Sequence, residues 1–169
     1  MPEYRRFMVE GGTYFFTVVT FNRLPILTSE KAREILRFAW KNTQERFPFN
    51  TDAICLLPNH LHCIWSLPEG DQNDSVRWKE IKRLFTKRYL EQIGPGEIRC
   101  EYRVKRNEAA IWQRRFWEHT IRDDRDFNKH VDYIHFNPVK HGLVKNAVDW
   151  PWSSLHRYLR SGYYSNERY

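Results

Sequence analysis

The sequence predicts an α+β fold of the ferredoxin-like type, a βαββαβ chain whose antiparallel sheet carries helices mainly on one face. Short aromatic and β-branched runs predict strands, and longer segments with apolar residues at helical spacing predict helices. Their order is strand, helix, strand, strand, helix, strand, then an added helix and a short C-terminal helix. The 169 residues, 41% of them hydrophobic, suffice for one core. We expect one domain over 1–160 and a flexible tail over 161–169.

The first half of the chain predicts three strands and one helix. Residues 13–21 are aromatic and β-branched and follow two glycines, which is typical of a strand. Residues 28–30 resemble a helix N-cap, and an apolar stripe follows up to Pro48. The apolar runs 52–57 and 61–67 flank a Pro-Asn turn, so they predict an antiparallel hairpin.

The second half predicts one more strand between helices. Residues 75–91 form a helix with a basic exposed face, because apolar and basic residues fall largely on different sides. Residues 97–110 are a polar, basic insertion without a defined pattern. A strand over 115–122 follows, and Asp123-Asp124 predicts the start of a helix that runs toward Asn137-Pro138. A short capped helix is expected after Ser154, and it completes the order above.

The charge balance favours a polyanionic partner. Lys and Arg number 28 against 21 Asp and Glu, a formal net charge of +7. Neither terminus carries an amphipathic helix rich in both Lys and bulky apolar residues, so nucleic acid is favoured over a membrane surface. No apolar run is long enough to span a bilayer, and residues 1–6 lack the apolar core of a secretion signal, which predicts a cytoplasmic protein. Cys55, Cys63 and Cys100 fit reduced, mostly buried thiols.

Two histidines occur one residue apart where a strand would ordinarily place apolar side chains. Because side chains alternate between faces along a strand, His60 and His62 point to the same side as Ile64. Positions i and i+2 lie about 6.5–7 Å apart along a strand, a span that two rings can close onto one metal ion or phosphate oxygen. Two partly buried, hydrogen-bonded histidines would give the same pattern, and for the pair alone this explanation is the more common one.

The helix over 124–138 carries a tyrosine in polar company. Tyr133 and Asn137 are four residues apart and share a face, with His130 one turn earlier, whereas Val131 and Ile134 turn toward the core. An amphipathic core tyrosine with a hydrogen-bonded hydroxyl would occupy the same place. A tyrosine nucleophile needs a cation or a base close by, because the ordinary pKa of a phenol is about 10.

The two features become informative when they are combined. A tyrosine that attacks a phosphodiester needs an electrophilic phosphorus and a stabilised leaving 3'-oxygen, and a divalent ion on two imidazoles and an amide oxygen supplies both. His60, His62 and Asn137 are therefore the candidate ligands, and Tyr133 is the candidate nucleophile. The expected ion is Mg or Mn, whose preference for oxygen leaves positions for a DNA phosphate, although a histidine pair also accepts Zn.

Five ordered sequence blocks resemble the REP-associated tyrosine transposases, domesticated relatives of the single-tyrosine HUH transposases of insertion sequences. The resemblance runs from about Tyr4 to Tyr158. Residues 60–62 match the HUH motif, Tyr133 matches the family nucleophile, and Asn137 matches an amide ligand one turn later. The blocks are Gly11-Gly12-Thr13-Tyr14-Phe15-Phe16-Thr17, Leu57-Pro58-Asn59-His60-Leu61-His62, Phe116-Trp117-Glu118-His119, Tyr133 to Val144, and Trp150-Pro151-Trp152-Ser153-Ser154.

The resemblance implies cleavage of single-stranded DNA beside REP hairpins, through a 5'-phosphotyrosine link, followed by rejoining. It also implies an HUH transposase-like catalytic domain and a monomer. Basic residues that could contact the DNA backbone are Lys79, Lys82, Arg83, Lys87, Arg103, Lys105, Arg106, Arg114 and Arg115. Trp112 or Trp117 could stack an unpaired base, although tryptophans beside a strand are more often core residues.

Two other functions remain open from the sequence. A domesticated transposase could keep REP-hairpin recognition and no longer cut DNA, and intact His60, His62 and Tyr133 favour the enzyme over this alternative. A metallohydrolase for small phosphoesters would turn over such compounds without any DNA-linked protein. The remaining histidines lack a comparable mutual spacing and are expected to be structural or exposed, although His130 could orient the tyrosine.

Overall fold

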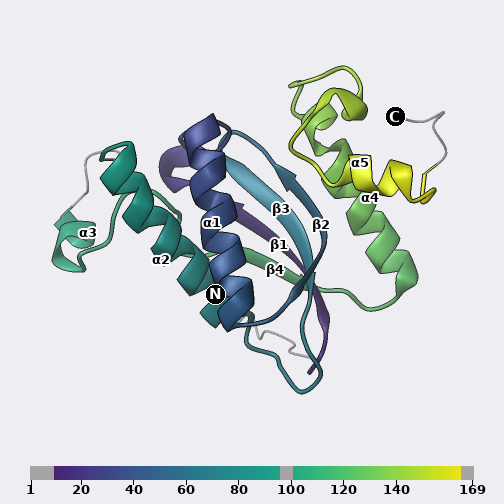
Figure 1. Cartoon of the computed structure of the whole chain (residues 1–169), viewed down its shortest axis with the longest axis horizontal. Helices are drawn as coiled ribbons and strands as arrows, with labels where there is room; N and C mark the ends of the chain where they lie inside the picture. Colours follow the sequence, from purple (N-terminus) through teal and green to yellow (C-terminus); the bar gives the residue numbers. More distant parts are fainter. Residues whose placement is uncertain (1–9, 96–100, 165–169) are drawn as a thin grey trace.

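A four-stranded antiparallel sheet with the strand order β2-β3-β1-β4 forms the centre of the fold (Figure 1). The computed structural model describes residues 10–95 and 101–164, to which the structural statements below refer. The strands are β1 (Thr13–Val19), β2 (Asn50–Leu56), β3 (His60–Ser66) and β4 (Trp117–Thr120). The helices are α1 (Glu30–Arg46), α2 (Asp74–Gln92), α3 (Glu101–Lys105), α4 (Asp124–Lys140) and α5 (Leu155–Arg160). This order confirms the predicted ferredoxin-like α+β fold.

The sheet register places Thr17, His62 and Trp117 of three neighbouring strands side by side. β1 is a central strand, and its Thr17 lies opposite His62 of β3 on one side and Trp117 of β4 on the other. The hairpin between β2 and β3 turns at Pro58-Asn59, as predicted, so His60 is the first residue of β3. His60 therefore lies at the end of the sheet where the chain turns from β2 into β3.

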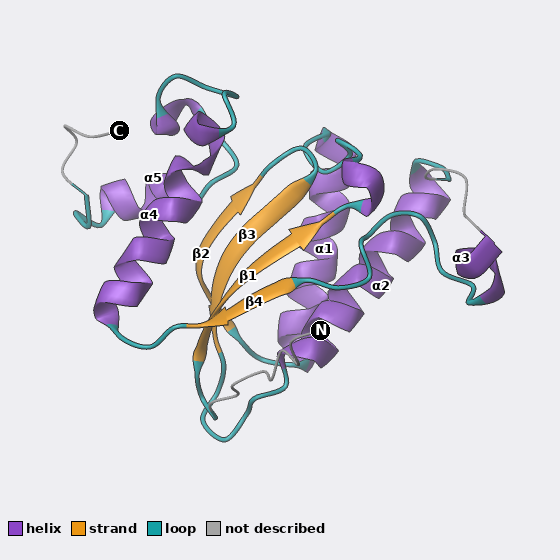
Figure 2. Ribbon diagram, turned by 180° about the vertical axis from the view of Figure 1, so that it is seen from behind, coloured by secondary structure: helices purple, strands orange, loops and turns teal. Residues whose placement is uncertain are grey.

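The two faces of the sheet carry different helices. Helices α1 and α2 cover one face, and α4 with α5 lies against the other (Figures 1 and 2). On the α1 and α2 face, Leu61, Cys63 and Trp65 belong to the larger apolar cluster, in which Trp65 stacks on Trp78 of α2 with centroids 4.3 Å apart. His60, His62 and Ile64 point to the α4 face, which confirms the predicted alternation.

Helix α4 begins as predicted and extends slightly beyond its predicted end. The Asp123 side chain accepts a hydrogen bond of 2.8 Å from the Asp126 backbone N–H, which is an N-cap. Pro138 lies inside the last turn, and the helix continues to Lys140. A proline inside a helix removes one backbone hydrogen bond and crowds the carbonyl four residues earlier. The helix nevertheless continues past Pro138, and the His141 N–H closes its end on the Asn137 carbonyl. Asn137 consequently stays helical and keeps its place one turn after Tyr133.

The predicted cap of the last helix is present, but Ser153 supplies its side-chain contact: the Ser153 hydroxyl accepts from the Leu155 backbone N–H at 3.1 Å. Ser154 precedes α5 but makes no side-chain cap hydrogen bond. Its hydroxyl oxygen accepts from the Ile54 backbone N–H at 2.9 Å and lies 2.8 Å from His135 Nε2. The hydroxyl is taken by β2 and α4 because α5 packs against the sheet edge, so Ser154 joins three elements instead of capping one.

The basic insertion contains helix α3 and a set of backbone anchors. Residues 97–100 lie outside the described residues, as does Cys100. The Arg103 guanidinium donates to the carbonyls of Ala109 and Trp112 and lies 4.1 Å from the centroid of the Phe21 ring. These contacts hold the described part of the insertion against the end of β1.

Two further expectations concern the thiols and the chain end. Cys55 and Cys63 are buried free thiols, and burial raises the pKa of Cys55 to about 12, which fits inert structural cysteines. The predicted tail is described as far as Tyr164, whose hydroxyl donates to Asp132 of α4 at 2.9 Å. Residues 165–169 lie outside the described part. Among the described helices, none is long and apolar enough to cross a membrane.

Candidate active site

The histidine pair and the tyrosine meet between the sheet and α4. The ring centroids of His60 and His62 are 4.9 Å apart, and the Tyr133 ring lies 5.2 Å from the His62 ring in an edge-to-face arrangement. The Phe15 ring of β1 stacks on the His62 ring, with centroids 5.6 Å apart, and its centroid lies 5.9 Å from that of the Tyr133 ring. The sheet register and the helix therefore bring together residues that lie more than 70 positions apart in the sequence.

Neighbouring oxygens orient both imidazoles. The Asn59 amide oxygen lies 2.6 Å from His60 Nδ1, and because an amide oxygen only accepts, Nδ1 donates and Nε2 keeps its lone pair. Thr17 Oγ1 lies 2.7 Å from His62 Nδ1, and when Nδ1 donates to this hydroxyl, Nε2 of His62 is likewise free to coordinate. Such partners fix the tautomer and orientation of metal-binding histidines.

Buried polar atoms without hydrogen-bond partners mark where an ion fits. Among the described residues, His62 Nε2, Asn137 Oδ1 and Asn137 Nδ2 are buried and make no hydrogen bond. Asn137 is fully buried and near enough to both imidazoles to favour their protonated forms slightly, yet no hydrogen bond of normal geometry joins them. Leaving such atoms unpaired costs free energy. Two imidazole nitrogens and an amide oxygen suit a divalent cation, so the residues present fit the ion that the resemblance implies.

Burial and surrounding positive charge keep both imidazoles neutral. Burial lowers the pKa of His62 to about 3, with smaller contributions from His60, His141 and Lys140. Burial, then the charges of His141 and Arg23, lowers the pKa of His60 to about 4. Neutral rings are the form that binds metal. The Lys140 ammonium also lies 5.0 Å from the centroid of the Tyr133 ring.

Sequence reasoning missed the cations around this site. Arg23 follows β1 in a short turn, with a φ of 53°, a left-handed conformation that a residue with a Cβ rarely adopts. Lys140 stands at the end of α4. Only the turn after β1 and the extension of α4 past Pro138 place these charges near His60 and His62. Together they make the site attractive for a phosphate.

The Thr17 hydroxyl should matter for metal affinity. Thr17→Val removes the oxygen beside His62 Nδ1 while keeping the shape of the side chain. We expect a 10- to 100-fold rise in the Mn²⁺ concentration that half-saturates the site, as is typical for the loss of a ligand's hydrogen-bond partner. Thr13→Val on the same face of β1, where the hydroxyl bonds Ser66, is the matched control and should leave this concentration unchanged. Equal behaviour of the two variants would contradict the role of Thr17.

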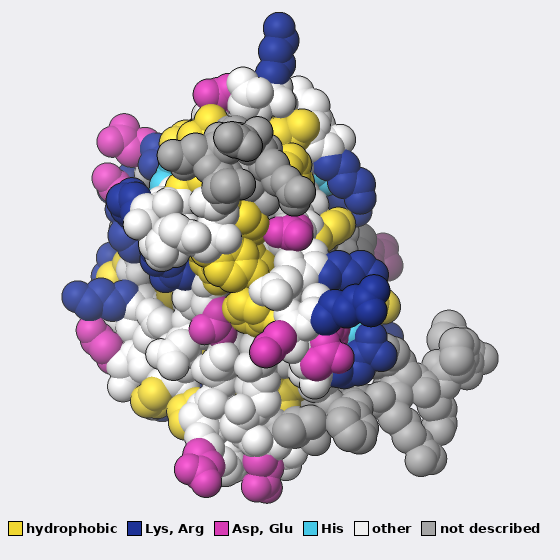
Figure 3. All heavy atoms as spheres, turned by 90° about the vertical axis from the view of Figure 1, so that its right-hand side faces the viewer, with side chains coloured by type: hydrophobic (Ala, Val, Ile, Leu, Met, Phe, Trp, Pro, Cys, Tyr) yellow, Lys and Arg dark blue, Asp and Glu magenta, His cyan; other side chains and the backbone are white. Residues whose placement is uncertain are grey.

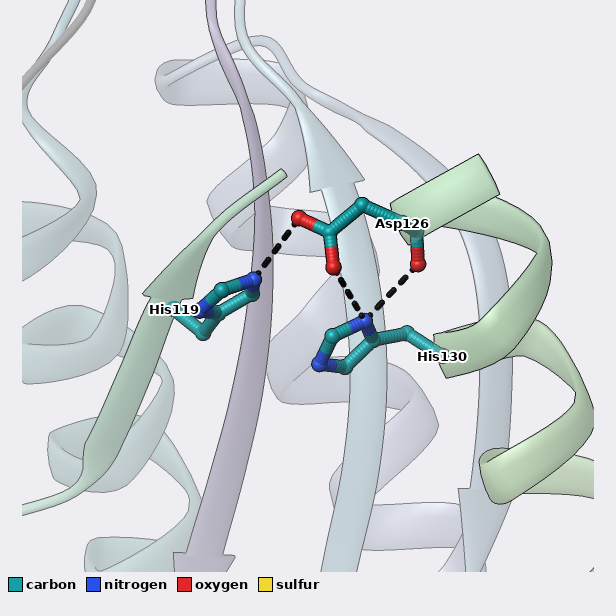
Figure 4. Close-up of side chains that lie close together, drawn as sticks. All are labelled: His119, Asp126 and His130. Carbon is teal, nitrogen blue, oxygen red and sulfur yellow. Dashed lines mark hydrogen bonds and ion pairs between the residues drawn. The ribbon is translucent and has the colours of Figure 1, made fainter. Parts of the chain in front are cut away.

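A second cluster, His119, Asp126 and His130, lies beside the first. In Figure 4 the Asp126 carboxylate stands between the rings of His119 from β4 and His130 from α4. It lies 2.8 Å from His119 Nε2 and 3.2 Å from His130 Nδ1, and the two rings stack at 4.5 Å. The three ligand atoms lie within 4.8 Å of one another, so this cluster could hold a metal ion. The expectation that these histidines have no useful mutual spacing is wrong, because the sheet and α4 converge at Asp126.

His135 is structural, as predicted. It is fully buried, with Nε2 2.8 Å from Ser154 Oγ and Nδ1 3.0 Å from the Tyr164 hydroxyl. Burial, and then the charges of Arg157 and His156, lowers the pKa of His135 to about 3. As a neutral hydrogen-bonding group, the ring therefore ties α4 to residues on both sides of α5.

The buried histidines predict that acid destabilises the protein. An unfolded histidine takes up a proton near pH 6.5, whereas folded His135 does so only near pH 3. Between these pH values the unfolded chain binds more protons than the folded protein. As the pH is lowered through this range, the free energy of unfolding therefore falls by about 1.4 kcal/mol per pH unit for such a histidine. Above about pH 6.5 this effect is absent. His60 and His62 add to the slope without metal. Urea unfolding at pH 7.5, 6 and 5 measures it.

His135→Gln is the matched variant for this pH dependence. Glutamine can keep hydrogen bonds to Ser154 and Tyr164 but takes up no proton. Between pH 6 and pH 5, the dependence of the unfolding free energy on pH should correspond to the uptake of one proton fewer than in the wild type. An unchanged slope would show that His135 is not held neutral in the folded protein.

Six of the nine predicted DNA contacts line one groove, which we call the basic groove. It has a volume of about 700 Å³ and runs between α2 and the segment after α3. Lys82 donates to the Gln113 carbonyl at 2.9 Å, and burial lowers its pKa to about 8, so this lysine is less exposed than predicted. The predicted contacts on the groove are Lys79, Lys82, Arg83, Lys87, Arg103 and Arg114, whereas Lys105, Arg106 and Arg115 are exposed beside it.

The face formed by α4 and α5 has a different charge pattern. Figure 3 views the molecule from this side, opposite the basic groove, and shows Lys and Arg side chains along both margins with Asp and Glu interspersed.

The two tryptophans that were predicted to stack bases differ in their exposure. Trp112 is a core residue, 7% exposed, whereas Trp117 on the edge strand β4 is 59% exposed.

Comparison with known proteins identifies relatives of nearly equal length. A REP-associated tyrosine transposase of Haemophilus influenzae is 45% identical over 99% of this chain and 93% of its own. One of Escherichia coli is 45% identical over 97% of this chain and 88% of its own. The solved structure of a REP-associated tyrosine transposase bound to a REP hairpin matches with a TM-score of 0.80 and 44% identity, over 98% of this chain and 89% of that one. No protein-family model matches the chain.

The fold, the site and these similarities define the class of protein as a transposase, an enzyme that uses a tyrosine nucleophile. The identity of 45% over nearly the full length also decides the family. The chain belongs to the REP-associated tyrosine transposases, which confirms the resemblance seen in its sequence.

Proposed function

We propose that the protein cleaves and rejoins single-stranded DNA at REP hairpins, with Tyr133 as nucleophile and a divalent ion, Mg or Mn, on His60, His62 and Asn137. One observation carries the proposal: the Tyr133 ring lies 5.2 Å from the His62 ring, beside buried polar atoms of His62 and Asn137 that lack partners. A phosphate at this place would be within reach of both the ion and the phenol. A related transposase has been captured with a REP hairpin, which supports the substrate.

The reaction is a transesterification and needs no cofactor other than the ion. The Tyr133 oxygen attacks the phosphorus, the phenol loses its proton, and the bond to the 3'-oxygen breaks. The products are a 5'-phosphotyrosine link and a strand with a free 3'-hydroxyl, which takes up a proton. Rejoining reverses these steps when a 3'-hydroxyl attacks the phosphotyrosine, so the phosphodiester energy is conserved.

The residues around Tyr133 have distinct tasks in this scheme. When bound, the divalent ion polarises the phosphate and stabilises the leaving 3'-oxygen. Asn59 and Thr17 hold the imidazoles in the coordinating tautomer through the contacts to their Nδ1 atoms. Lys140 and Arg23 add positive charge where the phosphate would approach, as their effects on the pKa values of His62 and His60 indicate.

We propose that the hairpin binds in the basic groove. Lys79, Arg83 and Lys87 are exposed along α2, and Arg114 faces them from the other side. Cations along a groove bind phosphates without reading sequence, so they contribute affinity and salt dependence. The predicted monomer stays a prediction in this scheme.

Neutralising the groove should weaken hairpin binding in a salt-dependent way. For the triple variant Lys79→Ala, Arg83→Ala, Lys87→Ala we expect a lower slope of log Kd against log salt, by roughly 0.9 for each phosphate that the protein no longer neutralises. Fluorescence anisotropy of a labelled REP hairpin at several salt concentrations measures the slope.

A second triple variant separates location from net charge. Lys31→Ala, Arg37→Ala, Lys41→Ala removes three exposed cations from α1, outside the basic groove. This variant should bind the hairpin with nearly the wild-type slope. Equal losses in both variants would show that overall charge, not the groove, attracts the DNA.

Incubation with single-stranded REP hairpin DNA and Mg²⁺ or Mn²⁺ tests the proposed function. A denaturing gel should show both a shortened DNA strand and a protein band shifted by covalently attached DNA. Hairpin binding without either product would mean a DNA-binding protein that no longer cuts. Turnover of small phosphoesters without DNA-linked protein would instead mean a metallohydrolase.

A further inference from the structure

A small pocket opens on the side of Tyr133 that faces β4. It has a volume of about 240 Å³, and we call it the tyrosine pocket. β1, β4 and α4 each supply part of its wall, and Tyr133 itself is one wall. The pocket is smaller than the roughly 300–1,000 Å³ of a site for a drug-sized ligand, so it suits a single compact group. Its lining residues are Phe15, Thr17, Trp117, Lys129, His130 and Tyr133.

The tryptophan on this pocket is exposed to an unusual degree. Trp117 is 59% exposed, whereas Trp65 and Trp78 in the core are at most 1% exposed. Its position opposite Thr17 in the sheet register places the ring at the pocket mouth on the edge strand. A large exposed aromatic ring beside a concave site is a platform on which nucleic-acid bases stack.

The other walls suit a nucleotide as well. Lys129 supplies a cation for a phosphate. His130 Nδ1 lies 2.8 Å from the Asp126 carbonyl and 3.2 Å from its carboxylate, and because both oxygens only accept, Nδ1 is the donor (Figure 4). With Nδ1 held by Asp126, Nε2 is the ring nitrogen left to hydrogen-bond the edge of a base. The His119 ring stacks on His130 and holds its orientation.

We propose that the tyrosine pocket binds one unpaired nucleotide next to the phosphate that Tyr133 attacks, with its base stacked on Trp117. The inference rests on the proposed function, because it assumes a single strand that passes Tyr133. It adds the subsite that holds the strand there: Trp117 supplies affinity, Lys129 contacts the backbone, and His130 Nε2 contacts the facing edge of the base. Double-stranded DNA is excluded, since a base inside a pair cannot enter a pocket of this size.

A fluorescent base can locate the occupant. REP hairpins with an unpaired tail carry 2-aminopurine at one tail position at a time and are bound to the Tyr133→Phe protein, which does not cut in the proposed scheme. We expect strong quenching at one position. In the double variant Tyr133→Phe, Trp117→Ala this quenching should disappear and the Kd of the tailed hairpin should rise about 10-fold. A hairpin without a tail should bind both proteins equally.

Two further variants make the test specific. Trp117→Phe should keep partial quenching, because an aromatic platform remains. Phe136→Ala removes another exposed aromatic residue of α4, one that does not line the pocket, and should change nothing. Quenching that survives Trp117→Ala, or that appears at no tail position, would overturn the proposal. Covalent adducts formed by the protein with intact Tyr133 are measured separately, so a failure of the cleavage scheme is distinguishable from a failure of the subsite.

Discussion

Replacing Tyr133 by phenylalanine should abolish covalent protein–DNA adducts and leave hairpin affinity nearly unchanged. The change removes one oxygen, the proposed nucleophile, and keeps the ring that packs against Phe15 and His62. The Tyr133 side chain is 40% exposed, so the fold should tolerate the change. The loss should be complete within detection, because no other group in the scheme forms the link to phosphorus. A denaturing gel with a labelled hairpin detects the adduct, and anisotropy measures the affinity.

Tyr163→Phe is the matched control for this result. Tyr163 is 41% exposed, much like Tyr133, and it lies near α4, where its hydroxyl donates to Asn128. This variant should form adducts at the wild-type rate. If Tyr133→Phe still forms adducts, another tyrosine is the nucleophile and the assignment is wrong.

Loss of the His62 imidazole should reduce cleavage by at least about 100-fold, the upper end of what loss of a ligand's hydrogen-bond partner costs. His62→Ala removes the nitrogen that is buried without a partner, and with it a proposed bond to the ion. His60→Ala should behave similarly. Cleavage by both should require more Mn²⁺ than the wild type, which a metal titration of the initial cleavage rate would show.

The histidine variants need a control for folding. His62→Gln offers an alternative to alanine, because an amide can bond Thr17 and fill the buried space. His156→Ala changes a histidine that bonds the Trp150 carbonyl outside the site, and it should keep full activity. Hairpin affinity reports whether each variant is folded. A His62→Ala protein that is folded and cleaves at the wild-type rate would show that the ion is not held there.

The fold was largely predictable because its signals are local. The aromatic run of β1, the period of α1 and α2, and the turn between β2 and β3 each act within a few residues. The opposite faces of β3 follow from strand geometry alone, which is why His60 and His62 were correctly paired. Asp123 caps α4 as its sequence position indicates.

The remaining features depend on contacts between distant segments. Ser153 caps α5 locally, whereas the hydroxyl of the adjacent Ser154 is used by β2 and His135, which no local pattern reveals. The cluster at Asp126 needs β4 and the first turn of α4 to converge. Trp112 and Trp117 are five positions apart and chemically identical, yet one is a core residue and the other is exposed, because only the second lies on the free edge of the sheet. Position in the assembled sheet, not residue type, separates them.

The predictions on the candidate site differ in what the structure adds to each of them. His60, His62, Asn137 and Tyr133 were chosen from spacing and resemblance, and their side chains do lie together. Their roles stay predictions, since proximity does not establish chemistry. Arg23 lies near the site because of the turn after β1, and Lys140 because α4 continues through Pro138. Sequence rules disfavour a proline inside a helix, so they do not predict this position of Lys140.

Identifying the residue that carries the DNA tests the central claim most directly. Wild-type protein is incubated with a REP hairpin and Mn²⁺, the adduct is digested with protease and nuclease, and the modified peptide is sequenced by mass spectrometry. We predict one nucleotide-bearing tyrosine, Tyr133, and no adduct when a chelator removes the metal. A link at any other residue, or an adduct that forms equally well with the chelator present, would contradict a metal-assisted attack by Tyr133.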